Sequence, residues 1–337
     1  MPDIPIRHWN ELAQEQWSSL LLGNGASIAL HPEFRYPTLH SVAHIRGLLP
    51  STGAIFARLG TTDFEHVLLS CWYAEHVNTA LGSPSPDITR AYAEVRSALI
   101  AAVHAVHPVH ADVLAALYRA AVFASRFNTV ITLNYDVTIY WAMLLFNATN
   151  GNWFKDAFVG ANGAFNPDWG YLRQPFGGAR GATLVFYPHG SLTIARDHLG
   201  RESKLMAGPA QDLLRTIADR WMSGYCVPVF VSEGTSAEKF ASIRRSHYLT
   251  NVYDGVVSSL GEAVVIYGWG FDERDQHILA AISRNAPRRI AVSVYTGQPA
   301  ADQQAYCHRI FGVIRPWLPY TAVDFFDSQS PACWSNP

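Results

Sequence analysis

Seven short apolar segments recur along the chain, and each ends in glycine or in a cluster of polar residues. Their apolar residues are continuous rather than alternating, which is typical of strands that are covered on both faces. Helical stretches separate most of the strands, and this alternation predicts a doubly wound, mostly parallel, Rossmann-like α/β sheet. The predicted strands are 18–25, 128–136, 182–190, 227–234, 263–270, 288–297 and 321–328.

The predicted helices are unevenly distributed among these strands. Residues 36–127 separate the first strand from the second, and their sequence is mainly helical in pattern. Because this segment is too long for one crossover helix, we predict that it forms a large helical insertion. Residues 1–35 and 128–337 would then form the Rossmann-like domain. The expected helices are 63–82, 87–106, 109–126, 136–147, 208–222, 235–245, 249–260, 273–284 and 299–310.

The segment 148–180 differs in composition from its surroundings, because it is rich in glycine, asparagine and aromatic residues. Such a composition predicts an ordered irregular loop, and loops of this length are often functional. We expect it to cover a ligand.

The overall composition narrows the functional classes. Hydrophobic residues make up 49% of the chain and charged residues 15%, which favours a well-buried domain over a disordered one. The formal net charge of −2 provides no positive field for nucleic acid or for an acidic membrane surface. Apolar stretches of membrane-spanning length and a signal-peptide pattern are both missing, so we expect a cytoplasmic protein. The four scattered cysteines lack CxxC spacing, and no metal is expected.

The first candidate for chemistry is the glycine loop 23–27 (GNGAS), which directly follows the first predicted strand. Glycines at such a place let backbone N–H groups approach a pyrophosphate. An ordinary glycine turn is an equally good interpretation of this loop alone. Ile28 interrupts the GxGxxG pattern, so the fingerprint of the standard dehydrogenases is not supported.

Two further strand ends carry polar side chains. Asn134 and Asp136 follow the second strand, where an amide and a carboxylate suit ribose hydroxyls or a positioned water, although Asp136 could equally cap the next helix. His189 lies between Pro188 and Gly190 at the end of the third strand, where an imidazole could act as a general base. A structural role is the common alternative for any one of the fourteen histidines.

The last two strand ends, 231–234 (VSEG) and 267–272 (YGWGFD), are again rich in glycine. Glycine at these positions permits close backbone contact with a flat or phosphorylated ligand. Glu233 could instead interact with the dipole of the following helix.

Taken in order, these five motifs resemble the sirtuin family, in its zinc-free bacterial branch. GNGAS followed by HPEFR (31–35) is similar to the sirtuin glycine loop with its downstream arginine segment, and TLNYD, YPHG, VPVFVSEG and VVIYGWG are similar to the later motifs. The resemblance spans residues 18–284. Segments 62–68 and 232–246 also resemble an uncharacterised bacterial family of the same superfamily.

The resemblance implies that NAD is the ligand and assigns roles to the matching residues. It implies that Asn134 and Asp136 act around the nicotinamide ribose, that His189 is the catalytic base and that Arg35 lies in a mobile loop over the nicotinamide. The other implied NAD contacts are Gly23, Asn24, Gly25 and Ser27 at the pyrophosphate and ribose, and Glu233, Gly268 and Trp269 on the adenosine side.

The departures from the family pattern shift the expected reaction. Residues 191–226 contain only Cys226, so the Cys₄ zinc module that helps deacetylating sirtuins hold a peptide is missing. Leu133 replaces the glutamine of one motif, and Trp269 lies within a GWG in place of GTS. The leading hypothesis is therefore hydrolysis of NAD to nicotinamide and ADP-ribose. Two alternatives stay open: a module that binds NAD or ADP-ribose-type nucleotides without turnover, and a protein deacylase or ADP-ribosyltransferase.

The resemblance also implies a biological setting. Zinc-free sirtuin-like NAD hydrolases resemble effectors of bacterial antiphage defence, which deplete NAD on infection. Unregulated hydrolysis would kill the host cell, and this chain has no evident sensor domain. We therefore expect a homo-oligomer or a separate activating partner protein.

Overall fold

The computed structural model describes residues 3–35, 38–197, 199–207, 212–223, 226–231 and 234–337. Its central feature is an eight-stranded sheet in which every paired strand runs parallel to its neighbour, in the order β1-β13-β12-β11-β2-β3-β7-β4. The strands are β1 Ile6–Arg7, β2 Ser19–Leu22, β3 Thr129–Thr132, β4 Phe154–Lys155, β7 Thr183–Phe186, β11 Ala263–Tyr267, β12 Arg289–Val294 and β13 Ala322–Asp327.

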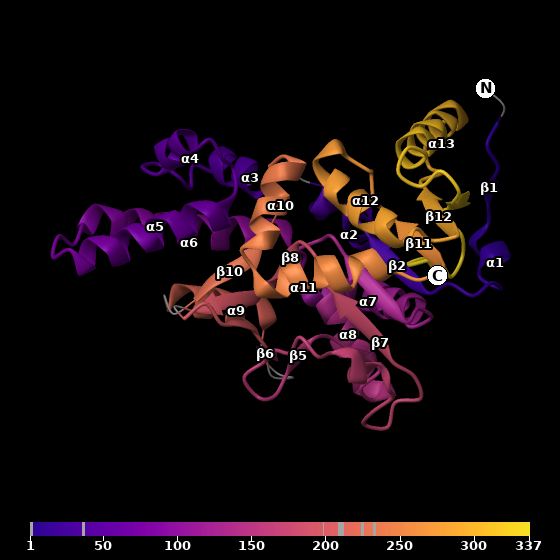
Figure 1. Ribbon diagram of the computed structural model, residues 1–337, viewed down its shortest axis with the longest axis horizontal. Coiled ribbons are helices and arrows are strands. Elements are labelled where there is room, and N and C mark those ends of the chain that lie inside the picture. The colour runs from indigo at the N-terminus through magenta and orange to yellow at the C-terminus, as the bar shows by residue number, and fades with distance from the viewer. Residues whose placement is uncertain (1–2, 36–37, 198, 208–211, 224–225, 232–233) are drawn as a thin grey trace.

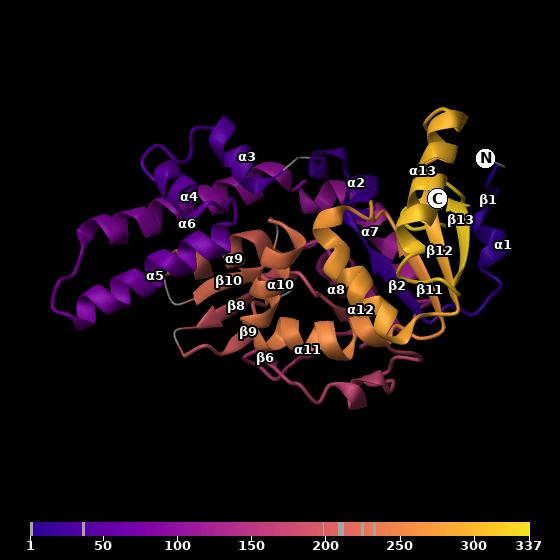
Figure 2. The ribbon, with the colours of Figure 1, turned by 45° about the horizontal axis from the view of Figure 1, so that its top comes forward.

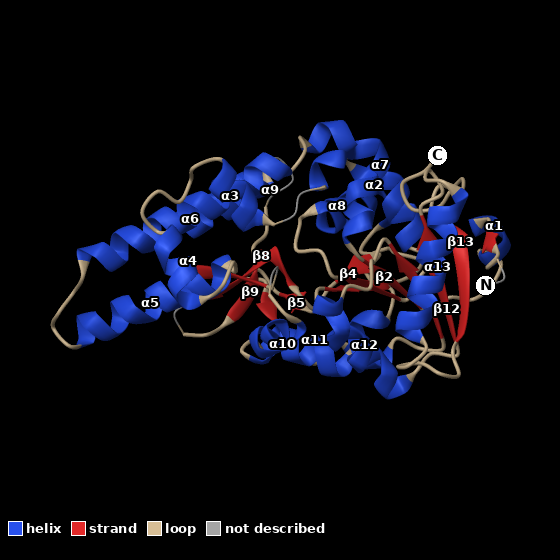
Figure 3. Cartoon of the chain, turned by 90° about the horizontal axis from the view of Figure 1, so that it is seen from above, coloured by secondary structure: helices blue, strands red, loops and turns tan. Residues whose placement is uncertain are grey.

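Helices cover both faces of this sheet, as Figure 3 shows. Helices α2, α7 and α8 lie on one face, and α10, α11 and α12 lie on the other. The doubly wound, mostly parallel Rossmann-like α/β fold predicted from the sequence is therefore confirmed. The bounds of the helices named here, with those of the two terminal helices, are α1 Trp9–Leu12, α2 Asn24–Leu30, α7 His110–Ala124, α8 Thr138–Asn150, α10 Ser236–Arg244, α11 His247–Gly255, α12 Gln276–Ile282 and α13 Ala300–Ile314.

The segment between β2 and β3 forms a helical lobe that projects from one end of the molecule (Figures 1 and 2). The lobe consists of α3 Leu39–Ile45, α4 Gly53–Leu59, α5 Phe64–Ala80 and α6 Pro86–Val106. The next helix, α7, returns to the sheet layer, where the ring of Phe123 lies 5.0 Å from that of Trp9. No single helix of the described residues is long and apolar enough to cross a membrane. Among these residues, one pair of consecutive helices, α6 and α7, has together the length and apolar composition of a membrane span, but the pair is bent by 70°.

A second, five-stranded sheet lies beside the first, and its pairs are all antiparallel, in the order β10-β8-β9-β6-β5. Its strands are β5 Phe158–Val159, β6 Ala164–Phe165, β8 Gly190–Asp197, β9 Glu202–Lys204 and β10 Cys226–Phe230, and α9 Leu213–Met222 precedes β10. The prediction that 227–234 continues the parallel sheet is therefore wrong, because β10 pairs antiparallel with β8. A strand buried on both faces shows the same apolar run in either sheet.

The predicted irregular loop 148–180 contains more regular structure than expected. It includes β4 at the edge of the parallel sheet, β5 and β6 of the antiparallel sheet, and a 3₁₀ turn at Gly170–Arg173. Short strands such as these leave almost no periodic signal in a sequence rich in glycine and asparagine.

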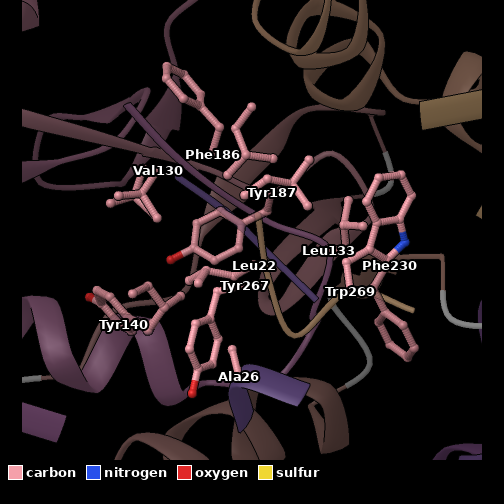
Figure 4. Packing of buried hydrophobic residues seen from close by; sticks show 14 of the residues in the cluster. Leu22, Ala26, Val130, Leu133, Tyr140, Phe186, Tyr187, Phe230, Tyr267 and Trp269 are labelled. Atoms are coloured by element: carbon pink, nitrogen blue, oxygen red, sulfur yellow. The ribbon is translucent and has the colours of Figure 1, made fainter. Parts of the chain in front are cut away.

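Large side chains fill the space beneath the carboxyl ends of the central strands (Figure 4). Leu22, Phe186 and Tyr187 are each at most 1% exposed, and Phe230 brings the antiparallel sheet into the same core. Interiors packed in this way are dense and resist deformation. The loops that leave these strand ends therefore start from fixed positions.

The two sheets are joined at Gly190, which follows β7 by three residues and begins β8. Gly190 has φ +75°, and a Cβ at this position would collide with the backbone carbonyl of Val229 in β10. Only glycine satisfies both the left-handed backbone and the close approach.

We predict that Gly190→Ala lowers the free energy of unfolding by about 2 to 4 kcal/mol, because it combines an unfavourable φ with a steric clash. Urea denaturation of the purified protein measures this change. Gly53→Ala is the matched control, since a Cβ there meets nothing within 4 Å, and it should change stability by less than about 1 kcal/mol. Equal effects of the two substitutions would contradict the steric explanation.

Glu65 connects the helical lobe to the antiparallel sheet. Its carboxyl is buried and hydrogen-bonds to the backbone of Phe230. Burial raises the pKa of Glu65 well above its ordinary value; Asp63 and Glu202 raise it further, and Arg196 opposes them. The folded protein thus holds a proton that the unfolded chain releases, so stability decreases as the pH rises from the unfolded pKa, about 4.3, toward the folded one.

We expect Glu65→Gln to remove this pH dependence, since glutamine keeps a hydrogen-bond acceptor but has no charge to bury. The stability gained over the wild type should increase as the pH is raised from 4 toward neutrality, measured by urea denaturation at several pH values. Glu238→Gln is a control of opposite sign, because hydrogen bonds from Thr235 lower the pKa of Glu238. A constant difference between Glu65→Gln and the wild type would rule out the buried proton.

Candidate functional site

A cavity of about 320 Å³ lies beyond the carboxyl ends of β2, β3, β7 and β11. From β2 the chain proceeds to β3 and β7 on one side and later to β11 and β12 on the other, and ligands of doubly wound folds bind where the strand order reverses. The cavity is lined by Gly23, Asn24, Thr38, Thr62, Leu133, Asn134, Tyr135, Asp136, His189, Val231, Gly234, Lys239, Gly268, Trp269, Gly270, Asp272, Arg274 and Asp275.

The glycine loops at the ends of β2 and β11 pack directly against each other. A Cβ on Gly23 would lie 2.5 Å from the Cα of Trp269, and one on Gly25 would lie 2.7 Å from the Cα of Gly268. The N–H of Gly25 donates to the carbonyl of Gly268 at 2.8 Å. These glycines are thus required by backbone packing, a reason that neither sequence interpretation of the 23–27 loop, close approach of a pyrophosphate or an ordinary glycine turn, had given. Gly23 and Gly268 also line the cavity, and Gly25 lies behind it.

Asn134 is held in one orientation by a chain of hydrogen bonds. Its Nδ2 donates to the carbonyl of Gly23 at 2.9 Å and to Ser27 Oγ at 2.8 Å. Ser27 Oγ in turn donates to Asp136 Oδ2 at 2.6 Å. Because both Nδ2 protons are used, the carbonyl Oδ1 of Asn134 is the end that can accept a hydrogen bond from a ligand or a water.

Asp136 supports this arrangement from a buried position, with 4% of its surface exposed. Its Oδ1 accepts from the backbone N–H of Thr138 at 2.9 Å, at the start of α8. The N-cap position of α8 is Val137, so Asp136 lies one residue before the cap, where its carboxylate accepts from the first N–H of the helix and fixes the Ser27 hydroxyl. Asp136 also lines the cavity.

His189 lines the same cavity and is 3% exposed. Its Nε2 lies 2.8 Å from Nε2 of His277, whose Nδ1 lies 3.1 Å from Ser236 Oγ. Burial lowers the pKa of His189 to about 3, with Lys239 and His277 acting in the same direction and Asp275 opposing. Burial likewise lowers the pKa of His277 to about 4. Both rings are therefore neutral near pH 7.

Two cationic side chains also reach the cavity. Lys239 of α10 is 8% exposed, and its Nζ lies 2.8 Å from Asp275 Oδ1. Arg274 pairs with Asp272, and its hydrogen bonds lower the pKa of that carboxyl to about 2. Cations at the carboxyl edge of a parallel sheet suit an anionic ligand.

Lys239, Asp275 and His277 were not predicted as site residues from the sequence. They lie at the starts of predicted helices, where charged and polar residues usually face solvent. No local spacing distinguishes these residues from ordinary surface positions in a single sequence. These residues could have been found only by knowing that the starts of two helices converge on one strand end. That knowledge requires the topology of the fold.

The remaining predicted residues take different places. Ser27 lies one hydrogen bond behind the cavity wall. Arg35 is exposed at the end of the 3₁₀ turn Pro32–Phe34 and does not line the cavity. Glu233 lies outside the described residues. The segment 148–180, expected to cover a ligand, contributes no residue to the described lining.

A second cavity of about 460 Å³ adjoins the first, with Thr62 and Gly234 lining both. Its walls come mainly from α3 and α4 of the helical lobe, including His40, Leu49 and Phe56. The lobe thus lines a separate cavity that shares Thr62 and Gly234 with the strand-end cavity.

The fold is that of a Rossmann-like α/β protein with a cavity at the carboxyl ends of its central strands. The chain belongs to the family described as a domain of unknown function, DUF4917, which matches residues 20–334. The match includes the helical lobe, every residue of the described cavity lining and the parallel sheet except β1 and the first residue of β2. A comparison with curated proteins finds no match.

The hydrogen bond between Ser27 and Asp136 gives a direct test of this geometry. We expect Asp136→Asn to lower the free energy of unfolding by about 1 to 3 kcal/mol, since a buried hydroxyl loses its acceptor. In a Ser27→Ala background the same substitution should cost less, with a coupling energy of roughly 0.5 to 3 kcal/mol. Urea denaturation of the four proteins measures the coupling.

Ser125→Ala provides the control for this cycle, because its hydroxyl hydrogen-bonds to Val122 and has no contact with Asp136. Its effect should add to that of Asp136→Asn. Additivity in the Ser27 cycle as well would show that the two side chains do not interact.

Proposed function

We propose that this protein hydrolyses NAD to nicotinamide and ADP-ribose. The proposal rests on one observation above all, which is the fixed amide of Asn134 in the wall of a strand-end cavity. Its free carbonyl Oδ1 can hold a water in one orientation. The order of the strand-end motifs, which resembles that of zinc-free sirtuins, supports NAD as the substrate.

The reaction requires little acid catalysis. The bond between nicotinamide N1 and ribose C1′ breaks with its electron pair moving to the nitrogen, which turns the cationic pyridinium into a neutral leaving group. The oxygen of a water bonds to C1′, and the water releases one proton. Rate acceleration then depends mainly on holding the ribose and placing the water. Asn134 serves this purpose, and Asp136 acts through Ser27 as a positioning residue.

The charges around the cavity fit the rest of the substrate. Lys239 and Arg274 can donate to the pyrophosphate, which would replace Asp275 and Asp272 as their partners, and the backbone at Gly23, Gly268 and Gly270 allows close approach of a phosphate or ribose. The adjoining cavity at the helical lobe supplies additional room for a dinucleotide.

A second candidate function is nucleotide binding without turnover. One observation favours it: His189 has Nε2 against His277 and a hydrogen bond to the backbone of Leu133, and its pKa is about 3. A general base works best with a pKa near the operating pH and with a free lone pair. A binding module would need neither property.

We extend the first proposal to a regulated enzyme that depletes NAD in antiphage defence, on the basis of the resemblance alone. Such an enzyme would be activated by self-association or by a partner protein. An isolated monomer that is fully active, and that cells tolerate when it is expressed, would contradict this extension.

The decisive measurement is nicotinamide release from NAD by the purified protein, over a range of protein concentrations. We expect Asn134→Ala to reduce the rate at least about a hundredfold while ADP-ribose still binds, because the substitution removes the water acceptor and keeps the cations and the glycine loops. Calorimetric titration with ADP-ribose measures the binding.

Asn162→Ala is the matched control, an exposed asparagine outside the described lining of this cavity, and it should leave the rate unchanged. Tight ADP-ribose binding with no nicotinamide release by the wild type in any oligomeric state would favour the binding module. Absence of both binding and release would refute NAD as the ligand.

A further inference from the structure

His189 and His277 converge on a single point in space. They come from different elements, since His189 follows β7 and His277 belongs to α12, yet their Nε2 atoms are 2.8 Å apart. Two imidazoles bound to one zinc at 2.0–2.1 Å place their nitrogens about 3.0 to 3.4 Å apart. A separation by a few tenths of an ångström would therefore turn this pair into two ligands of one ion.

The far side of each ring matches what metal-binding histidines require. Such histidines usually hydrogen-bond through the second ring nitrogen to a carbonyl, a carboxylate or a hydroxyl, which fixes the ring and directs the other lone pair at the metal. His277 Nδ1 lies 3.1 Å from Ser236 Oγ, and His189 hydrogen-bonds to the backbone of Leu133. The 2.8 Å between the two Nε2 atoms is a hydrogen-bond distance, and a metal ion bound by both nitrogens would replace the proton that they share.

Asp275 supplies a third ligand. One ligand atom from each of Asp275, His189 and His277 lies within 4.8 Å of the other two. Asp275 Oδ1 is paired with Lys239, whereas the contact of Oδ2 within the described part of the chain is a long one, 3.4 Å to the indole N–H of Trp269. The carboxylate can therefore turn one oxygen to an ion while it keeps Lys239 on the other.

We propose that His189, His277 and Asp275 form a binding site for a divalent transition-metal ion of the zinc type. Two imidazoles and one carboxylate are a ligand set for Zn²⁺, Co²⁺ or Mn²⁺ rather than for Ca²⁺. His189 and Asp275 line the strand-end cavity, so the position left open by three protein ligands faces the bound ligand or a water.

The charge balance gives the site a distinct property. Lys239 and Asp275 neutralise each other in the metal-free protein, so a divalent ion adds two positive charges at the cavity wall. An anionic ligand such as a phosphate would complete the coordination and offset the charge. Lys239 also repels the ion, and its removal should strengthen metal binding.

The test uses purified full-length protein without an affinity tag, with no nucleotide present, so that its result is independent of NAD hydrolysis. Titration with Co²⁺ is followed by visible absorption, and titration with Zn²⁺ by calorimetry and thermal unfolding. We expect one ion per chain, with d–d bands of a site rich in nitrogen ligands and a raised Tm for the metal-bound protein.

Three variants and a control make the result specific. His277→Ala and Asp275→Asn should each weaken binding at least tenfold, while Lys239→Met should strengthen it about tenfold through loss of a neighbouring cation. His76→Ala, which removes an exposed histidine of α5, should bind as the wild type does. Circular dichroism shows whether each variant folds. If His277→Ala or Asp275→Asn fails to fold, Lys239→Met still tests the proposal, because it keeps all three metal ligands.

Three outcomes would overturn the proposal. One is the absence of saturable binding by the wild type, and another is binding that survives His277→Ala in a folded protein. The third is an N–H···N hydrogen bond between His189 and His277 that persists in excess Zn²⁺, as measured by ¹⁵N NMR of the histidines. Such a hydrogen bond would make the pair a purely structural contact.

Discussion

The contact between the glycine loops of β2 and β11 is the constraint on which the site depends. These strands are neighbours in the sheet, and the backbones of residues 23–25 and 268–269 touch without intervening side chains. Any side chain at Gly23 or Gly25 would separate the two loops. The contact fixes the carbonyl of Gly23, which holds the amide of Asn134, and that amide leads through Ser27 to Asp136. A backbone contact between two strand ends thus determines where a polar side chain faces the cavity.

Most of the parallel sheet could be predicted because its strands are buried on both faces. A continuous apolar run such as 263–267 leaves a strong signal, and the alternation with helices then gives the fold class. The two-residue strands β1 and β4 are too short to show a pattern. The predicted strand 227–234 was assigned to the wrong sheet, because burial determines the apolar run and the choice of partner strand depends on contacts distant in sequence.

The positions of the site residues along the strands could also be predicted from the sequence, whereas their surroundings could not. Asn134, Asp136 and His189 lie where the strand ends predicted them, since a parallel sheet brings its carboxyl ends together. Their individual environments could not be predicted, and the low pKa of His189 is an example, because it results from burial and from Lys239 and His277 on two other helices. The glycines were located correctly and explained incompletely, as packing alone requires them. Arg35 followed only from a resemblance, and it lies away from the cavity wall.

The connection between the two sheets has a mechanical consequence. Only Tyr187, Pro188 and His189 separate the last residue of β7 from the first of β8, and Gly190 is pressed against β10. A shift of the antiparallel sheet is therefore transmitted along a tether of three residues directly to the imidazole of His189. Glu65 ties the helical lobe to that same sheet through Phe230. The helical lobe is thus connected to the wall of the cavity by a short covalent and hydrogen-bonded path.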